Sequence, residues 1–199
     1  MQNHSVQGMH RQKAEFLQRK DLSEVMELFC KCFWQDAYYR ELFPEESLRA
    51  EAFRGSFRET IEYCIGQGSS LGVWEGGRLI GFCICFPYQR LRDHDPYRFQ
   101  RIFSLEEAVL PYEKALHGTI AALPGEVMYC LSIAVDPDFR RRGVASSVLE
   151  GILERNPSCV FAADVSNEEA LDLYRKHNFA IQLLDDGYYL AIRKPLPFF

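Results

Sequence analysis

The chain has 199 residues, of which 47% are hydrophobic and 14% aromatic, enough to bury one sizeable core in a single domain. Its formal net charge of -5 argues against a general binder of nucleic acid or of anionic membranes, since both need a basic face. No stretch approaches the roughly 20 apolar residues of a membrane span, and residues 1–12 are polar rather than a signal peptide. We expect a cytoplasmic protein whose residues 1–12 are flexible.

The first half of the chain is predicted to begin with a short strand over 14–18 and a helix over 22–33, capped by Asp21. Residues 34–44 are rich in aromatic side chains and are expected to be irregular. A second long helix is predicted over 47–65. Its buried stripe is expected to comprise Leu48, Phe53, Phe57, Ile61 and Ile65.

A hairpin follows, with strands over 71–75 and 78–86. The turn between them, Gly76-Gly77, tolerates the positive φ angles that a tight primed turn requires. Residues 88–126 form a longer connection than usual, with a helix predicted over 105–122. We interpret this segment as an insertion.

The stretch from Leu131 to Glu154 predicts a strand, a turn and an amphipathic helix. Apolar residues up to Val135 indicate a buried strand, and Asp136-Pro137-Asp138 ends it. The helix is expected to start near Gly143. Its first backbone N–H groups have no intrahelical partner and carry the positive end of the helix dipole, so they can bind a phosphate. A lone arginine run is more often a solvated turn, so this motif needs its context.

The rest of the chain predicts a strand over 159–164, a helix over 168–177 and a final hairpin. The hairpin strands are expected over 179–184 and 188–193, with the turn at residues 185–187.

The seven cysteines are interpreted as small buried hydrophobes. Cys83 and Cys85 are spaced C-x-C, which places both on one face of a strand, whereas a zinc site prefers C-x-x-C pairs. No metal site is expected.

The segments RRRGVA at residues 140–145 and NEEALDLYRKHNF at residues 167–179 are similar to two motifs of the GNAT superfamily of acyl-CoA N-acyltransferases. Residues 140–145, RRRGVA, match the pattern R/Q-x-x-G-x-G/A, in which Ala145 is a permitted small residue. Residues 167–179, NEEALDLYRKHNF, resemble the later motif N-x-x-A-x-x-L-Y-x-K-x-G-F. Asn178 replaces the usual glycine, and after glycine asparagine best tolerates positive φ at a helix end.

The resemblance implies an α/β (α+β) fold over residues 1–199. Its mixed central sheet has about seven strands, splayed between the fourth and fifth, with four to five flanking helices. In this chain the splayed strands are 128–135 and 159–164. The opening between them is expected to hold the pantetheine arm of acetyl-CoA.

The resemblance also implies the cofactor contacts. Backbone groups of Ile133 and Val135 would bind the pantetheine amides, and the turn at 140–145, with the N–H of Ser146, would hold the pyrophosphate. Arg140 and Arg141 either add bonds to phosphates or are solvated. The expected cofactor-binding residues are Ile133, Ala134, Val135, Arg140, Arg141, Arg142, Gly143, Val144, Ala145, Ser146, Asn167 and Tyr174.

For catalysis, the resemblance implies that Tyr174 protonates the departing thiolate, since a phenol is protonated at neutral pH. The alternative is a tyrosine packed in the core. Asn167 matches the motif residue that contacts the cofactor arm, although it is also an ordinary N-cap. We take Glu126 as the base, with Asp164, His117 and water-mediated transfer as alternatives.

The acceptor site is expected to combine aromatic side chains with acidic neighbours, which suits a small amine or cation. The acidic candidates are Asp36, Glu45 and Glu46. The aromatic candidates are Trp34, Tyr38, Tyr39, Phe43, Tyr97, Phe103, Tyr112, Tyr188 and Tyr189. The predicted function is transfer of an acetyl group to a primary amine of a small molecule or peptide, by a monomer or homodimer. The alternative is a non-catalytic acyl-CoA sensor or partner-binding module.

Overall fold

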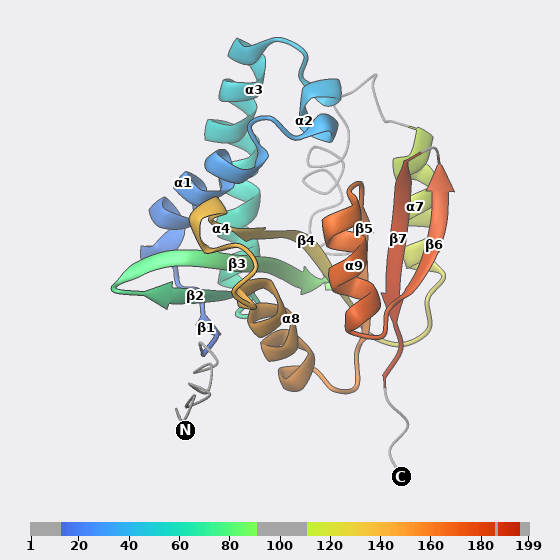
Figure 1. The fold of residues 1–199 in the computed structure, drawn as a ribbon. Helices are drawn as coiled ribbons and strands as arrows, with labels where there is room; N and C mark the ends of the chain where they lie inside the picture. Colours follow the sequence, from blue (N-terminus) through green and yellow to red (C-terminus); the bar gives the residue numbers. More distant parts are fainter. Residues whose placement is uncertain (1–12, 91–110, 186, 196–199) are drawn as a thin grey trace, which may run out of the picture.

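The computed structural model describes residues 13–90, 111–185 and 187–195 (Figure 1). Within them a seven-stranded mixed sheet runs in the order β1-β2-β3-β4-β5-β7-β6. Strands β4 and β5 are parallel, and the other neighbours are antiparallel. The strands are β1 (Glu15–Phe16), β2 (Leu71–Glu75), β3 (Arg78–Pro87), β4 (Val127–Val135), β5 (Val160–Val165), β6 (Ala180–Asp185) and β7 (Tyr188–Arg193).

Helices cover both faces of this sheet. One face packs on a first core that includes residues of α1 (Leu22–Phe33), α2 (Ala37–Leu42), the π-helix η2 (Phe53–Phe57), α4 (Arg58–Gly66) and α7 (Pro111–Ala121). The other face packs on a second core with α8 (Val144–Arg155) and α9 (Glu168–Lys176). Figure 1 shows α8 and α9 in front of the sheet. None of the described helices is long and apolar enough to cross a membrane.

The helix α1 has the predicted bounds, but its predicted cap is wrong. The backbone of Asp21 is helical and its side chain makes no cap bond to α1. The carboxylate instead accepts a hydrogen bond from the backbone N–H of Gln18, 2.8 Å away. A short 3-10 helix (Arg19–Asp21) precedes α1 and joins it without a break, so Asp21 belongs to that turn.

The segment after α1 is more regular than expected. Residues 37–42 form α2. Its N-cap is Asp36, whose carboxylate accepts from the Tyr38 N–H at 3.0 Å. This is ordinary N-capping that the sequence could have indicated. The predicted long helix is three joined pieces, α3 (Glu46–Ala52), η2 and α4.

The buried stripe of that helical stretch also differs at its start. Leu48 is 50% exposed, whereas Arg49 is only 3% exposed. The Arg49 guanidinium donates to the Phe43 carbonyl at 2.9 Å and lies 4.6 Å from the Trp34 ring centroid. These contacts compensate part of the cost of burying the charge, and Arg49 precedes Phe53 by the four residues that place both on one helix face.

The two predicted hairpins are present. Gly76 and Gly77 have φ angles of 60° and 80°, as the first turn requires. In the second hairpin Gly187 has φ 75°, while residue 186 of the predicted turn lies outside the described residues. The strand predicted over 14–18 is limited to β1. Of the helix predicted over 105–122, residues 105–110 lie outside the described residues, as does the segment 1–12.

Candidate functional site

The parallel strands β4 and β5 separate part of the way along their length. Their pairing ends at Cys130 and Ala163, although β4 continues to Val135. Leu131 is skipped in the pairing of β4 with β3, where Cys130 and Ser132 oppose consecutive β3 residues. Such a bulge bends a strand and ends regular pairing. The opening therefore begins where the bulge redirects β4.

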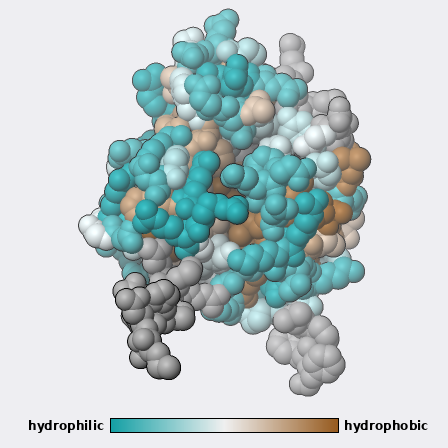
Figure 2. Space-filling model, viewed as in Figure 1, coloured by the Kyte–Doolittle hydropathy of each residue, from teal (hydrophilic) through white to brown (hydrophobic). Residues whose placement is uncertain are grey.

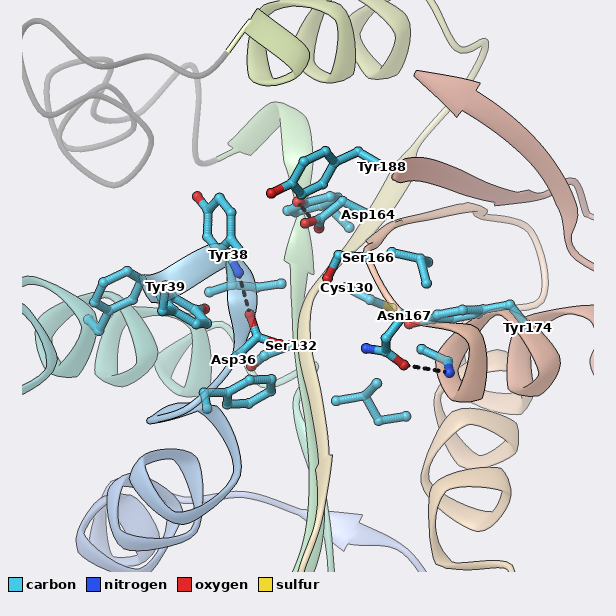
Figure 3. Close-up of a pocket in the computed structure, with 17 residues that line it drawn as sticks. Asp36, Tyr38, Tyr39, Cys130, Ser132, Asp164, Ser166, Asn167, Tyr174 and Tyr188 are labelled. Atoms are coloured by element: carbon cyan, nitrogen blue, oxygen red, sulfur yellow. Dashed lines mark hydrogen bonds between the residues drawn. The ribbon is translucent and has the colours of Figure 1, made fainter. Parts of the chain in front are cut away.

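A cavity of about 110 Å³ lies at this opening. Figure 3 shows side chains pointing into it from β4, the end of β5, α9 and the segment around α2. Its lining residues are Phe33, Asp36, Tyr38, Tyr39, Phe57, Tyr129, Cys130, Leu131, Ser132, Ile133, Asp164, Val165, Ser166, Asn167, Ala170, Tyr174 and Tyr188. In Figure 2 the visible surface is largely hydrophilic, with hydrophobic residues in a recess near its centre.

The turn at residues 140–143 leads into α8 with two left-handed residues. Arg141 has φ 62° and Gly143 has φ 83°. The first helical bond runs from the Ser147 N–H to the Gly143 carbonyl, at 2.9 Å, so the preceding N–H groups have no intrahelical partner. A left-handed residue followed by a right-handed one points successive N–H groups at one spot, which forms an anion-binding concavity. The three arginines of this turn are exposed.

Asp136, which precedes this turn, holds it to α1 and β3. Its carboxylate is 1% exposed, lies 2.7 Å from the Lys31 ammonium and pairs with Arg78. It also accepts from the Asp138 N–H at 3.1 Å. Burial alone would raise the pKa of Asp136, but these hydrogen bonds and charges together lower it. The Phe139 ring extends this anchor, since the Arg142 guanidinium lies 4.8 Å and that of Arg78 5.8 Å from its centroid.

The first turn of α8 also contacts the end of α9. The Ser146 hydroxyl lies 3.1 Å from Nε2 of His177 and 3.5 Å from the Lys176 ammonium. The motif at 167–179 therefore packs beside the turn at residues 140–143, which we name the phosphate-type turn. The segments that carry the two sequence motifs are in contact.

Tyr174 projects from α9 toward the opening (Figure 3). It is 2% exposed, and its ring packs against Phe179 with centroids 4.9 Å apart. Burial, together with the nearby thiols of Cys130 and Cys83, raises the pKa of the phenol well above its usual value. The hydroxyl therefore stays protonated at neutral pH and can donate a proton. Tyr174 is thus both packed in the core and part of the cavity lining.

Two other predicted cofactor residues, Ile133 and Asn167, line the cavity. Ile133 lines the cavity, Ala134 is buried, and Val135 is half-buried beyond the point where β4 leaves β5. Asn167 has both predicted features, because its side chain accepts from the Ala170 N–H at 2.9 Å as an N-cap and also lines the cavity.

The predicted base, Glu126, is not near the cavity. It is exposed and precedes β4, at the end of the strand opposite the opening. Its carboxylate lies against Cys159, whose pKa is raised by burial and by this charge. His117 is also elsewhere, with Nδ1 3.0 Å from the Tyr88 hydroxyl and a pKa lowered to about 4 by burial. Among the carboxylate and histidine candidates, only Asp164 lines the cavity.

The predicted acceptor aromatics divide between the cavity and the cores. Tyr38, Tyr39 and Tyr188 line the cavity, whereas Phe43 packs on Phe57 and Trp34 on Arg49. Of the acidic candidates, Asp36 lines the cavity and Glu45 and Glu46 are exposed. Tyr189 packs on the second core. Tyr97 and Phe103 lie outside the described residues, and the side chain of Tyr112 is not among those described.

Sequence reasoning did not identify nine of the lining residues as site residues: Phe33, Phe57, Tyr129, Cys130, Leu131, Ser132, Val165, Ser166 and Ala170. Phe57 and Cys130 are apolar and typical of a core, and both do pack in the cores. Tyr129 and Ser132 sit within an apolar strand, where a polar side chain is a usable signal for a site. Their alignment toward the opening depends on the bulge, which has no clear local signal.

These residues fit the acyl-CoA arm that the motifs imply. The Ser132 hydroxyl is buried, lines the cavity and has no hydrogen-bond partner among the described residues. An unsatisfied buried hydroxyl is costly, so a polar ligand in the opening would satisfy it. The concave N–H groups at the start of α8 suit a pyrophosphate. No group of three or more His, Cys, Asp or Glu side chains suited to a metal occurs in the described part of the chain.

Known structures with the same fold cover nearly the whole chain. An apo agmatine N-acetyltransferase is 11% identical with a TM-score of 0.70, covering 90% of this chain and 97% of the other. A polyamine N-acetyltransferase from Drosophila melanogaster is 10% identical with a TM-score of 0.67, covering 91% and 98%. A PaiA N-acetyltransferase from Thermoplasma acidophilum, in complex with coenzyme A, is 14% identical with a TM-score of 0.58, covering 92% and 98%.

A search of curated protein sequences finds no match. The model of the acetyltransferase (GNAT) family matches residues 24–179, more than half of the chain and both motifs. The sheet with its parallel β4–β5 pair confirms the predicted fold. By its family match, its sheet and its phosphate-type turn, this chain belongs to the GNAT acetyltransferase family.

Proposed function

We propose that this protein is an N-acetyltransferase that moves an acetyl group from acetyl-CoA to a primary amine, by direct transfer in a ternary complex. The observation that carries the proposal is the contact between two features. The N–H groups before Ser147 would form an anion site at the start of α8, and Ser146 there contacts His177 at the end of α9, the helix from which Tyr174 reaches the cavity.

The residues with roles toward the cofactor are those of the two motifs. Backbone N–H groups at Gly143, Val144, Ala145 and Ser146 would bind the pyrophosphate, with Arg140, Arg141 and Arg142 adding positive charge. Ile133, Ala134 and Val135 would bind the pantetheine arm along the part of β4 that does not pair with β5, with Asn167 across the opening. Bound acetyl-CoA supplies the acetyl group as an activated thioester.

Tyr174 acts as the general acid in this proposal. Its phenol donates a proton to the thiolate that leaves as the carbon–sulfur bond breaks. A binding module for acyl-CoA has no use for a buried phenol at that point, so Tyr174 favours catalysis over the sensor alternative.

The acceptor is a small amine in this proposal. The cavity has two carboxylates, Asp36 and Asp164, and the tyrosines Tyr38, Tyr39 and Tyr188. Aromatic faces and carboxylates together attract cations. The names of two structural neighbours, an agmatine and a polyamine N-acetyltransferase, support this class of acceptor.

The test measures free thiol release from acetyl-CoA against a panel of agmatine, polyamines, aminoglycosides, amino acids and peptides. We expect release that depends on one class of amine and falls about 100-fold or more in Tyr174→Phe, with CoA affinity unchanged within about twofold. Full activity in a folded Tyr174→Phe variant would refute the acid assignment. CoA binding without release from any amine would favour the sensor.

A further inference from the structure

Asp164 is the carboxylate that the opening presents most directly. It follows Ala163, the last residue of β5 that pairs with β4, and its half-buried side chain lines the cavity (Figure 3). The backbone of β5 at this point pairs with β7, at Leu190. At Asp164, β5 therefore pairs with β7 on one side and borders the opening toward β4 on the other.

Tyr129 holds this carboxylate in place from the opposite strand. The Tyr129 side chain is 1% exposed, and its hydroxyl donates to Oδ1 of Asp164 at 2.5 Å. The bond spans the two strands just before they separate. A carboxylate offers about four lone pairs, so Oδ2 keeps its capacity to accept a proton from a ligand.

The described lining of the cavity is acidic. Its described lining contains Asp36 and Asp164 and no Lys, Arg or His. Burial raises the pKa of Asp164, the Tyr129 hydrogen bond lowers it in part, and the charge of Asp36 raises it further. The titratable groups that face Asp164 are Tyr129 and Cys130 on β4, Asp36 and Tyr39 near α2, Tyr174 on α9 and Tyr188 on β7.

Asp36 is less suited to act on a ligand. Its Oδ1 already accepts the Tyr38 N–H at 3.0 Å and caps α2. Its charge adds to the field in the cavity, but its position serves the helix. Asp164 has no such structural duty beyond its bond to Tyr129.

We propose that Asp164, oriented by Tyr129, receives the ammonium group of the acceptor and takes the proton that makes its nitrogen a nucleophile. This inference rests on the proposed acetyl transfer. A proton passes from R–NH₃⁺ to Oδ2 of Asp164, the nitrogen forms a bond to the acetyl carbon, and the carbon–sulfur bond breaks. Tyr174 protonates the thiolate and regains a proton from the new amide nitrogen. The proton on Asp164 leaves to solvent with the products.

The first test compares Asp164→Asn with the wild type, using agmatine and then the best acceptor of the panel. Asp172→Asn on the exposed face of α9 is the matched control, since it also removes one carboxylate. We expect kcat/KM of Asp164→Asn to fall about 100-fold or more, while CoA affinity and the control stay within about twofold. A loss below about threefold would overturn the proposal.

The pH profile separates a proton acceptor from a structural residue. In the wild type, kcat/KM rises with pH as Asp164 ionises and then levels off below the pKa of the amine. In Asp164→Asn it continues to rise toward the pKa of the amine, because only the free amine reacts. Tyr129→Phe removes a bond that lowers the pKa of Asp164, so the acidic limb moves to higher pH. Unchanged profiles in both variants would contradict the assignment.

The last test uses a weakly basic acceptor amine. 2,2,2-Trifluoroethylamine is largely neutral at pH 8, so it does not need a base to free its nitrogen. We expect the defect of Asp164→Asn to shrink at least tenfold with this amine, and an equal defect with both amines would refute proton transfer to Asp164.

Failure of the inference and failure of the proposed function give different results. Wild-type turnover with an unaffected Asp164→Asn variant would leave acetyl transfer intact and remove Asp164 from it. If no amine is turned over, calorimetric binding of agmatine to the CoA complex still tests the cation site. Binding that needs Asp164 supports its contact with the ammonium, and binding equal in both proteins excludes it.

Discussion

Replacing Gly143 with alanine tests the phosphate-type turn by adding only a methyl group and no charge. Gly143 has φ 83°, and a Cβ built there has no heavy atom of another residue within 4 Å apart from its chain neighbours. The substitution therefore causes no clash. Its cost is the left-handed backbone of an L-residue, about 1–2 kcal/mol.

This cost is divided between stability and binding. If the turn keeps its shape, the free energy of unfolding falls by about 1 kcal/mol, which lowers Tm by about 2–4 °C in a protein of this size. If the turn relaxes, stability is retained, but restoring the N–H groups on binding costs the same about 1 kcal/mol. That corresponds to about a fivefold higher Kd for CoA.

The assay combines thermal unfolding with calorimetric titration of CoA. The matched control is Gly118→Ala, at an exposed position inside α7 where an added Cβ again meets nothing within 4 Å. A glycine within a helix is destabilising, so this control should gain about 0.5–1 kcal/mol in stability and bind CoA normally. A Gly143→Ala protein with unchanged Tm and unchanged Kd would refute the requirement for the left-handed turn.

Three further predictions concern residues that do not line the cavity. Gly81→Ala would bring a Cβ to 2.5 Å from Val144 Cγ1, so we expect a loss of about 1–3 kcal/mol in urea unfolding and weaker CoA binding, because Val144 begins α8. Asp136→Asn removes the carboxylate that pairs with Lys31. Because the pKa of Asp136 is lower in the folded protein than the value of about 3.9 in the unfolded chain, the carboxylate stabilises the fold above that pH, and this stability is lost as the pH falls. The free energy of unfolding of the variant should therefore depend less on pH below about 4. The pKa of His117 is about 4 in the folded protein and about 6.5 in the unfolded chain, so the unfolded chain takes up a proton first as the pH falls. The free energy of unfolding of the wild type should therefore fall by about 2–3 kcal/mol between pH 7 and pH 4.5, and that of His117→Gln should fall less. Equal pH slopes for wild type and either variant would contradict that assignment, and a Gly81→Ala protein of wild-type stability would contradict the close packing of Gly81 against Val144.

Much of the fold was predictable because its signals are local. Apolar residues at helical spacing placed α1, α8 and α9, and glycine pairs placed the hairpin turn at Gly76 and Gly77. The turn before α8 was predictable because the chemistry of an anion site needs small residues and free N–H groups next to one another in sequence.

The errors arose where a distant partner decided the outcome. Arg49 replaced Leu48 in the buried stripe because its guanidinium donates to the Phe43 carbonyl and packs on the Trp34 ring. Helical spacing alone favours burial of the apolar Leu48, because it does not take account of contacts that compensate for burial of Arg49. We took Glu126 as the base, but it lies just before β4, and β4 and β5 separate toward the other end of that strand.

By itself, the sequence determined the family motifs, the order of the elements and the residues of the phosphate-type turn, since each depends on neighbours within a few positions. Only the tertiary structure decided which side chains meet in the cavity. Asp36, Tyr129, Asp164 and Tyr174 come from four separate elements and meet because the bulge at Leu131 opens β4 from β5. Strand register and the packing of the two cores set that geometry, and both depend on contacts between residues far apart in the chain.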